Sequence, residues 1–96
     1  MGKKIILQFE EPNEYRCLLI EDECLKYESE SHGEQEVEAK YWLDQSETKR
    51  LFDCIAKDQD VLNVLRDYFQ DRLNAEAFIN LCDRYGISCK REVWWE

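Results

Sequence analysis

The side chains that most often perform catalysis are few in this sequence and poorly placed for it. The one histidine, His32, stands in Ser31-His32-Gly33, a stretch typical of a β-hairpin tip. A Cys–His or Ser–His pair would have to use this residue, and we expect every cysteine to lie in the core. His32 is therefore predicted to be a turn residue and not a general base.

The cysteines form no recognisable ligand set. All five are widely spaced, and no two of them have the C-x-x-C spacing of a zinc site; they are Cys17, Cys24, Cys54, Cys82 and Cys89. Four of the five fall within or beside apolar stripes, which is typical of reduced, structural thiols in a cytoplasmic protein. We expect no metal and a cytoplasmic location.

Nucleotide and carboxylate chemistry are also poorly supported. The glycines Gly2, Gly33 and Gly86 are isolated, so the chain has no glycine-rich phosphate loop or dinucleotide fingerprint, and we expect no cofactor. Carboxylate pairs such as Glu36 with Glu38 are easy to find, but nothing marks one as buried and perturbed. The sequence predicts a protein that is not an enzyme.

Charge is the unusual quantity. Of the net −9, residues 1–48 hold 13 acidic and five basic residues, net −8, whereas residues 49–96 hold nine and eight, net −1. Such a field repels nucleic acid and anionic membranes, and it attracts basic partners. No stretch approaches the roughly 20 apolar residues of a membrane span. We therefore expect no direct nucleic-acid or membrane binding.

Three helices are predicted over about 44–57, 59–71 and 75–85. Asp44 and Glu47 have the spacing of a capping box, Asp58 or Asp60 is expected to cap the second helix, and Asn74 the third. Each range carries an apolar stripe at intervals of three and four residues. Gly86 stands where a left-handed residue ends the last helix.

Alternating residues predict four strands before the helices and one after them, in an antiparallel meander with a C-terminal edge strand. A three-residue loop, Ser31-His32-Gly33, would pair Tyr27 with Val37, Leu25 with Ala39 and Lys26 with Glu38, with Gly33 left-handed. The predicted core face is Tyr15, Cys17, Leu19, Leu25, Tyr27, Val37, Ala39 and Tyr41. We predict one α+β domain over residues 1–96, with the three helices on one face of the sheet.

The opposite face is the candidate partner-binding surface. Apolar anchors with a charged rim are typical of interfaces. The acidic candidates are Glu21, Asp22, Glu23, Glu28, Glu36 and Glu38, and the apolar anchors are Leu18, Ile20, Trp42 and Trp94. The competing interpretation is that the last strand or a helix covers Leu18, Ile20 and Trp42.

These features favour a small acidic binding protein that neutralises a basic, nucleic-acid-handling protein by occlusion, as an immunity protein or a phage inhibitor does. A second hypothesis is a structural or accessory subunit, self-associating through its apolar residues, whose acidity serves only solubility. A third is an enzyme that uses a carboxylate or a thiol.

Overall fold

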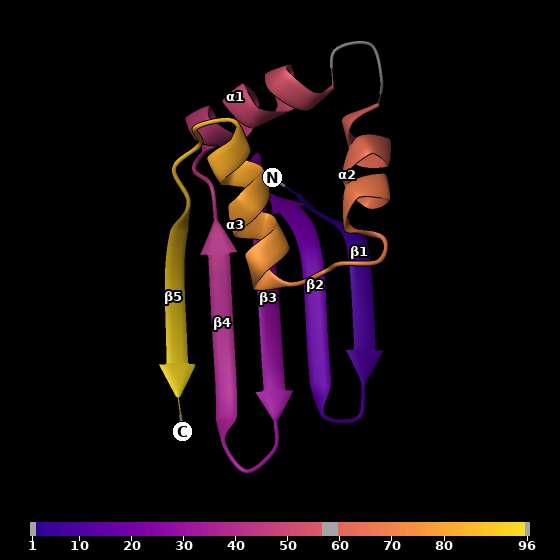
Figure 1. Cartoon of the computed structure of the whole chain (residues 1–96), viewed down its shortest axis with the longest axis vertical. Helices are drawn as coiled ribbons and strands as arrows, with labels where there is room; N and C mark the ends of the chain where they lie inside the picture. The colour runs from indigo at the N-terminus through magenta and orange to yellow at the C-terminus, as the bar shows by residue number, and fades with distance from the viewer. Residues whose placement is uncertain (1, 57–59, 96) are drawn as a thin grey trace.

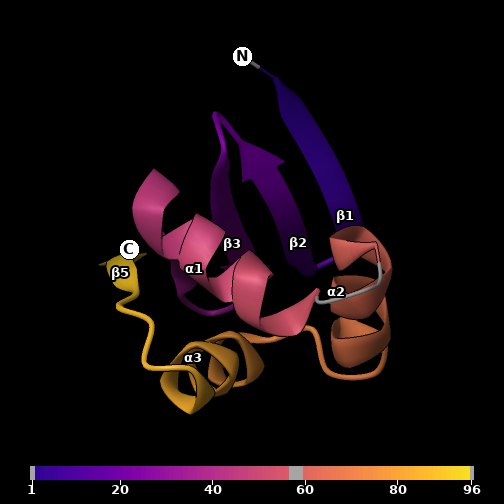
Figure 2. The ribbon, with the colours of Figure 1, turned by 90° about the horizontal axis from the view of Figure 1, so that it is seen from above.

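The computed structural model describes residues 2–56 and 60–95. The elements in chain order are β1 (Lys3–Glu11), β2 (Glu14–Glu21), β3 (Cys24–His32), β4 (Glu36–Trp42), α1 (Gln45–Ile55), α2 (Val61–Phe69), α3 (Ala75–Arg84) and β5 (Lys90–Trp95). The strands form one antiparallel sheet in the order β1-β2-β3-β4-β5, and all three helices lie on one side of it (Figures 1 and 2). The predicted α+β architecture, with β5 at the edge, is confirmed.

The helices begin where short polar side chains accept a backbone amide. Asp44 Oδ1 accepts from the Glu47 amide at 2.9 Å, and Asn74 Oδ1 accepts from Ala77 at 2.8 Å. Asp60 caps α2 through the Leu62 amide. These three predicted caps are confirmed, whereas the alternative Asp58, the predicted end at 57 and the predicted start at 59 lie outside the described residues.

Half of the predicted capping box at α1 is wrong. The Glu47 carboxylate accepts from the Ser88 amide at 3.0 Å and from Arg50 Nη1 at 2.8 Å instead of returning to the cap. The segment between α3 and β5 passes close to Glu47, and its Ser88 amide belongs to neither a helix nor a strand. The charge-assisted hydrogen bond to the Glu47 carboxylate satisfies this amide. Glu47 therefore ties α1 to the segment that leads into β5.

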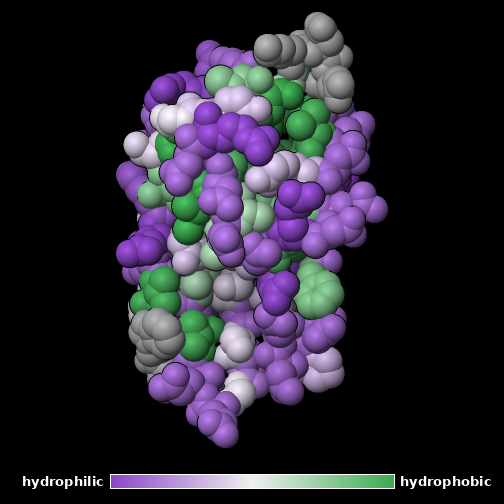
Figure 3. All heavy atoms as spheres, viewed as in Figure 1, coloured by the Kyte–Doolittle hydropathy of each residue, from purple (hydrophilic) through white to green (hydrophobic). Residues whose placement is uncertain are grey.

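The core lies between the sheet and the helices. Tyr27 on β3 stacks on Phe78 of α3 with ring centroids 6.1 Å apart, and Phe78 lies 6.5 Å from Phe69 of α2. Leucines from the sheet and from each helix fill the space around these rings and are buried, namely Leu18, Leu25, Leu51, Leu65 and Leu81. The outer surface of the helices is mostly hydrophilic, with hydrophobic residues visible in patches (Figure 3).

The predicted β3–β4 register is wrong by four residues. Tyr27 pairs with Tyr41, not Val37, and the loop is Gly33-Glu34-Gln35 between His32 and Glu36. The hairpin instead closes at His32 and Glu36, and this register brings the Tyr27 and Tyr41 rings to a centroid distance of 6.1 Å. Gly33 does not have the expected positive φ, and His32 ends a strand. Because the shift is even, the predicted faces of β3 and β4 remain correct.

The predicted face of β2 is wrong. The Asp22-Glu23 turn has φ of 53° and 66°, the type I′ geometry of a two-residue hairpin, and it places Leu18 opposite Tyr27. The even-numbered residues of β2 therefore point to the helices. The predicted core residues Tyr15, Cys17 and Leu19 lie on the other face. Alternation could not decide this, because β2 is apolar on both sides.

Candidate protein-binding face

One face of the sheet carries no helix, and we call it the open face (Figure 2). It presents the odd-numbered residues of β2 and the even-numbered residues of β3, β4 and β5. Its acidic members on these four strands are Glu21, Glu28, Glu30, Glu36, Glu38 and Glu92, and its basic members are Lys26, Lys40 and Lys90. The open face is therefore a mixed surface with an excess of negative charge.

The open face brings together six of the ten predicted partner-binding residues: Glu21, Glu28, Glu36, Glu38, Trp42 and Trp94. Asp22 and Glu23 form the exposed turn at the end of β2 and β3. Trp94 is 43 % exposed, so it can contact another molecule, whereas Trp42 is half-buried.

Leu18 and Ile20 do not belong to the open face. Leu18 is fully buried against the helices, and Ile20 is half-buried in a groove beside Phe52 of α1. The two-residue turn after β2 causes this, since it fixes which side of the strand meets Tyr27. Their expected placement beside the acidic residues is a wrong prediction, and the competing interpretation that helices cover them is confirmed.

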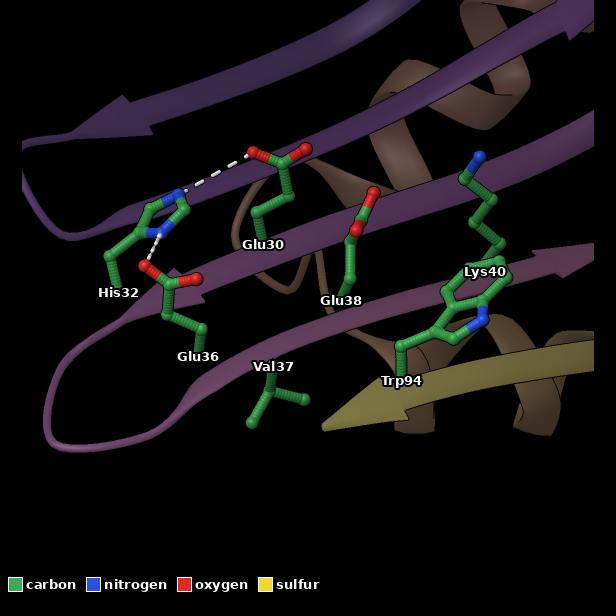
Figure 4. Close-up of a pocket in the computed structure, with 7 residues that line it drawn as sticks. All are labelled: Glu30, His32, Glu36, Val37, Glu38, Lys40 and Trp94. Atoms are coloured by element: carbon green, nitrogen blue, oxygen red, sulfur yellow. Dashed lines mark ion pairs between the residues drawn. The ribbon is translucent and has the colours of Figure 1, made fainter. Parts of the chain in front are cut away.

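At the end with the β3–β4 loop, the sheet extends beyond the helices (Figure 1). A pocket of about 530 Å³ lies on the open face there, and Figure 4 shows the residues that line it. Its lining combines carboxylates, an aromatic ring and a histidine, from Glu30, His32, Glu36, Val37, Glu38, Lys40 and Trp94. Lys40 Nζ lies 5.5 Å from the centre of the Trp94 ring. The pocket thus already holds one ammonium group against the ring, a cation–π contact that an incoming cation can imitate.

His32 is held by carboxylates on two strands. Its Nε2 lies 3.5 Å from Glu30 Oε2, and its Nδ1 lies 3.8 Å from Glu36 Oε1 (Figure 4). Both carboxylates project into the same pocket as Glu38 and Trp94. The arrangement suits recognition of positive charge: three carboxylates and an aromatic face can accept a guanidinium or ammonium group.

At the other end of the open face, a lysine and a carboxylate of the sheet pair with each other. Lys26 Nζ lies 2.9 Å from Glu21 Oε1, and this hydrogen bond holds the pKa of Glu21 below its usual range. Glu28 and Glu92 line a smaller cavity of about 240 Å³ nearby, with Trp42 and Lys40. Glu21 is thus paired with a lysine of the sheet, and its side chain is less exposed, at 37 %, than those of Glu30 and Glu36, at 45 % and 61 %.

Near the middle of the open face, Tyr15 and Cys17 hydrogen bond to each other. This bond, with burial, raises the pKa of Tyr15 to about 12, and burial raises that of the Cys17 thiol. Neither group is activated as a nucleophile, because raised pKa values favour the neutral forms.

Sequence analysis missed Glu30 and Lys40 as part of the site. The alternation of β3 continues to His32, and it places Glu30 on the open face. Lys40 lies on the same face and contacts the Trp94 ring. The Lys40–Trp94 cation–π contact depends on the β4–β5 register, for which the sequence analysis made no prediction.

The expectation that every cysteine lies in the core is wrong for Cys54, which is exposed on α1, and for Cys24, which is half-buried at the start of β3 and outside the core. Within residues 2–56 and 60–95, no group of three or more His, Cys, Asp or Glu side chains is arranged to hold a metal ion. Among the helices of these same residues, none is long and apolar enough to cross a membrane. Comparison of the chain with family models, with curated proteins and with solved structures gives no match.

Proposed function

We propose that this protein is a small acidic, non-enzymatic binding protein that neutralises a basic, nucleic-acid-handling protein by covering its phosphate-binding surface. The observation that carries the proposal is the exposed Trp94 ring beside Glu30, Glu36 and Glu38 on the open face. Immunity proteins and phage-encoded inhibitors are the two classes that such a surface fits.

The chemistry of the pocket supports a cationic ligand. A lysine or arginine of the partner would place its charge between the carboxylates and its alkyl stem against Trp94. A buried aromatic anchor surrounded by charged groups is the usual composition of an energetic hot spot. A standard interface needs about 800 Å² on each partner, roughly an eighth of the 6436 Å² surface of this chain.

The excess negative charge also supports rapid association. Most of the net charge lies in residues 1–48, which form the first four strands and the start of α1. A basic partner would be steered toward that side of the molecule, and added salt would slow association. A partner that normally binds phosphates would lose access to nucleic acid once its lysines and arginines are covered.

The test is affinity capture from a lysate of the source cell with a salt gradient, performed with wild type and two triple variants. The first variant reverses Glu30, Glu36 and Glu38 to lysine on the open face. The second reverses Asp53, Asp67 and Asp71, three exposed acids on the helix side, and so changes the net charge equally. We expect one basic protein to be retained by wild type and by the helix-side variant and lost by the open-face variant.

Two results would contradict this proposal. Equal loss with both variants would mean that only net charge matters. Recovery of the chain alone, or as its own oligomer in sedimentation, would favour the accessory-subunit hypothesis, for which the exposed Ile5 and Phe9 on the edge strand β1 are the supporting observation.

A further inference from the structure

Two cysteines outside the open face lie in contact. Cys82 is near the end of α3, and Cys89 immediately precedes β5. Between them Gly86 takes a φ of 66°, and the Ile87 amide donates to the Cys82 carbonyl at 2.9 Å, so the chain reverses direction. The reversal packs Cys89 against the core cluster that contains Cys82, where the two thiols interact.

The two thiols have different environments. Cys82 is 1 % exposed and belongs to the core, whereas Cys89 is half-buried at the edge of the core. The Cys89 sulfur donates to the Lys90 carbonyl at 3.4 Å. Interaction with the Cys82 thiol lowers the pKa of Cys89, while the same interaction and burial raise that of Cys82. Cys89 is therefore the sulfur that a small oxidant in solvent can reach, whereas Cys82 is covered by the core.

We propose that Cys82 and Cys89 are a redox-modification site that closes to an intramolecular disulfide when the protein meets a peroxide. The Cys89 thiolate attacks one oxygen of hydrogen peroxide, the O–O bond breaks, and Cys89 becomes a sulfenic acid with release of water. The Cys82 sulfur then attacks the Cys89 sulfur, the S–O bond breaks, and a second water leaves. Two thiols are oxidised to one disulfide and one peroxide is reduced to two waters.

This site is independent of the open face. The disulfide would join α3 covalently to the residue before β5, next to the Ser88 amide that Glu47 already holds at 3.0 Å. A thiol-reducing system would reopen it by exchange. The exposed Cys54 on α1 provides an internal comparison, because it is more accessible than Cys89 but lies on a different element.

The test uses the full reduced chain, treated with hydrogen peroxide, alkylated and digested with trypsin. Cleavage after Arg72, Arg84 and Lys90 places Cys82 and Cys89 in separate peptides, residues 73–84 and 85–90. We expect mass spectrometry to find these two peptides joined and separated again by reductant. The cross-link should form in Cys54→Ser as in wild type and be absent from Cys89→Ser.

A further variant separates the roles of the two sulfurs. In Cys82→Ala, Cys89 should still react with peroxide and be trapped as a sulfenic acid by dimedone, whereas in Cys89→Ala the Cys82 sulfur should give no adduct. Circular dichroism of each reduced variant checks that it is folded. The proposal is overturned if folded wild type gives no joined peptides at a peroxide dose that oxidises Cys54, or if urea-unfolded chain forms them equally fast.

Discussion

Leu18 and Leu19 are neighbours on β2 and both are fully buried, yet they lie on opposite faces of the sheet. Leu18 packs in the cluster that includes Tyr27 and Phe78, under rigid helices. Leu19 lies outside that cluster, and its cross-strand partners on the open face are Ile5 and Lys26. The two leucines are equally buried, but in different ways. Leu18 is covered by the helices, whereas Leu19 is covered by other side chains of the sheet.

The same substitution at these two neighbours should separate the faces most strongly. Leu18→Ala should cost about 3 to 4 kcal/mol of unfolding free energy, because helices and rings cannot collapse into the cavity. Leu19→Ala should cost about 2 kcal/mol, since a flexible neighbour such as Lys26 can move into the space. Urea denaturation of both variants measures the difference, and equal losses would mean that the open face is as rigidly packed as the core.

The buried hydroxyl of Thr48 connects α1 with the sheet, and removing it should have the next largest effect. Its Oγ1 accepts from the Leu25 amide at 3.0 Å and donates to the Leu43 carbonyl at 3.4 Å. Thr48→Val keeps the volume but leaves a buried amide unpaired, so we expect a loss of about 2 kcal/mol. Thr48→Ser retains the hydroxyl and should lose less in the same denaturation experiment; the reverse order would show that methyl packing dominates.

These comparisons show where sequence reasoning succeeded. The caps Asp44, Asp60 and Asn74 could be identified because a cap depends only on residues next to it in the sequence. The spacing of the apolar residues likewise predicted which face of each helix is buried. Gly86 was equally local, since few residues other than glycine adopt its φ of 66° at a helix end.

Sequence reasoning failed where the decision depended on a turn. The register of β3 and β4 is set by Gly33-Glu34-Gln35, and the face of β2 by Asp22-Glu23. The second turn lacks the glycine that its two positive φ values favour, and in the first turn Gly33 does not take a positive φ. A one-residue slip exchanges the faces of a whole strand, and this is why Leu18 was placed with the acids instead of in the core. The pocket around Trp94 was missed because it also requires the pairing of β5 with β4, two strands that lie far apart in sequence and whose pairing no local pattern specifies.

The two hairpin turns offer a smaller test of this explanation. Glu23 has a φ of 66°, which is unfavourable for a residue with a Cβ, so Glu23→Gly should stabilise the protein by about 1 kcal/mol. Glu34 in the other tip has no positive φ, and Glu34→Gly should leave stability unchanged or slightly lower. Thermal unfolding of this matched pair decides, and equal responses would argue against strain in the Asp22-Glu23 turn.

Acid pH should weaken the helix side through Asp44 and Glu47. The Glu47 amide holds the pKa of Asp44 below its ordinary 3.8, and the Ser88 amide with Arg50 holds that of Glu47 below 4.5. Their stabilising contribution is complete above the ordinary values and is lost as pH falls through the lowered ones. Denaturation midpoints should decline below about pH 4.5, and Glu47→Gln should make this decline shallower. An unchanged slope would show that Glu47 does not contribute.

The position of β5 beside β4 has a consequence for the order of folding. The first four strands pair with their immediate neighbours in sequence, but β5 reaches β4 only after the excursion through residues 43–89. Closing that long loop costs chain entropy that the hairpins do not require, so β5 should join the sheet last. In pulse-labelled hydrogen exchange its amides should gain protection after those of β2 and β3, and until then the outer edge of β4 is open to pairing with another chain.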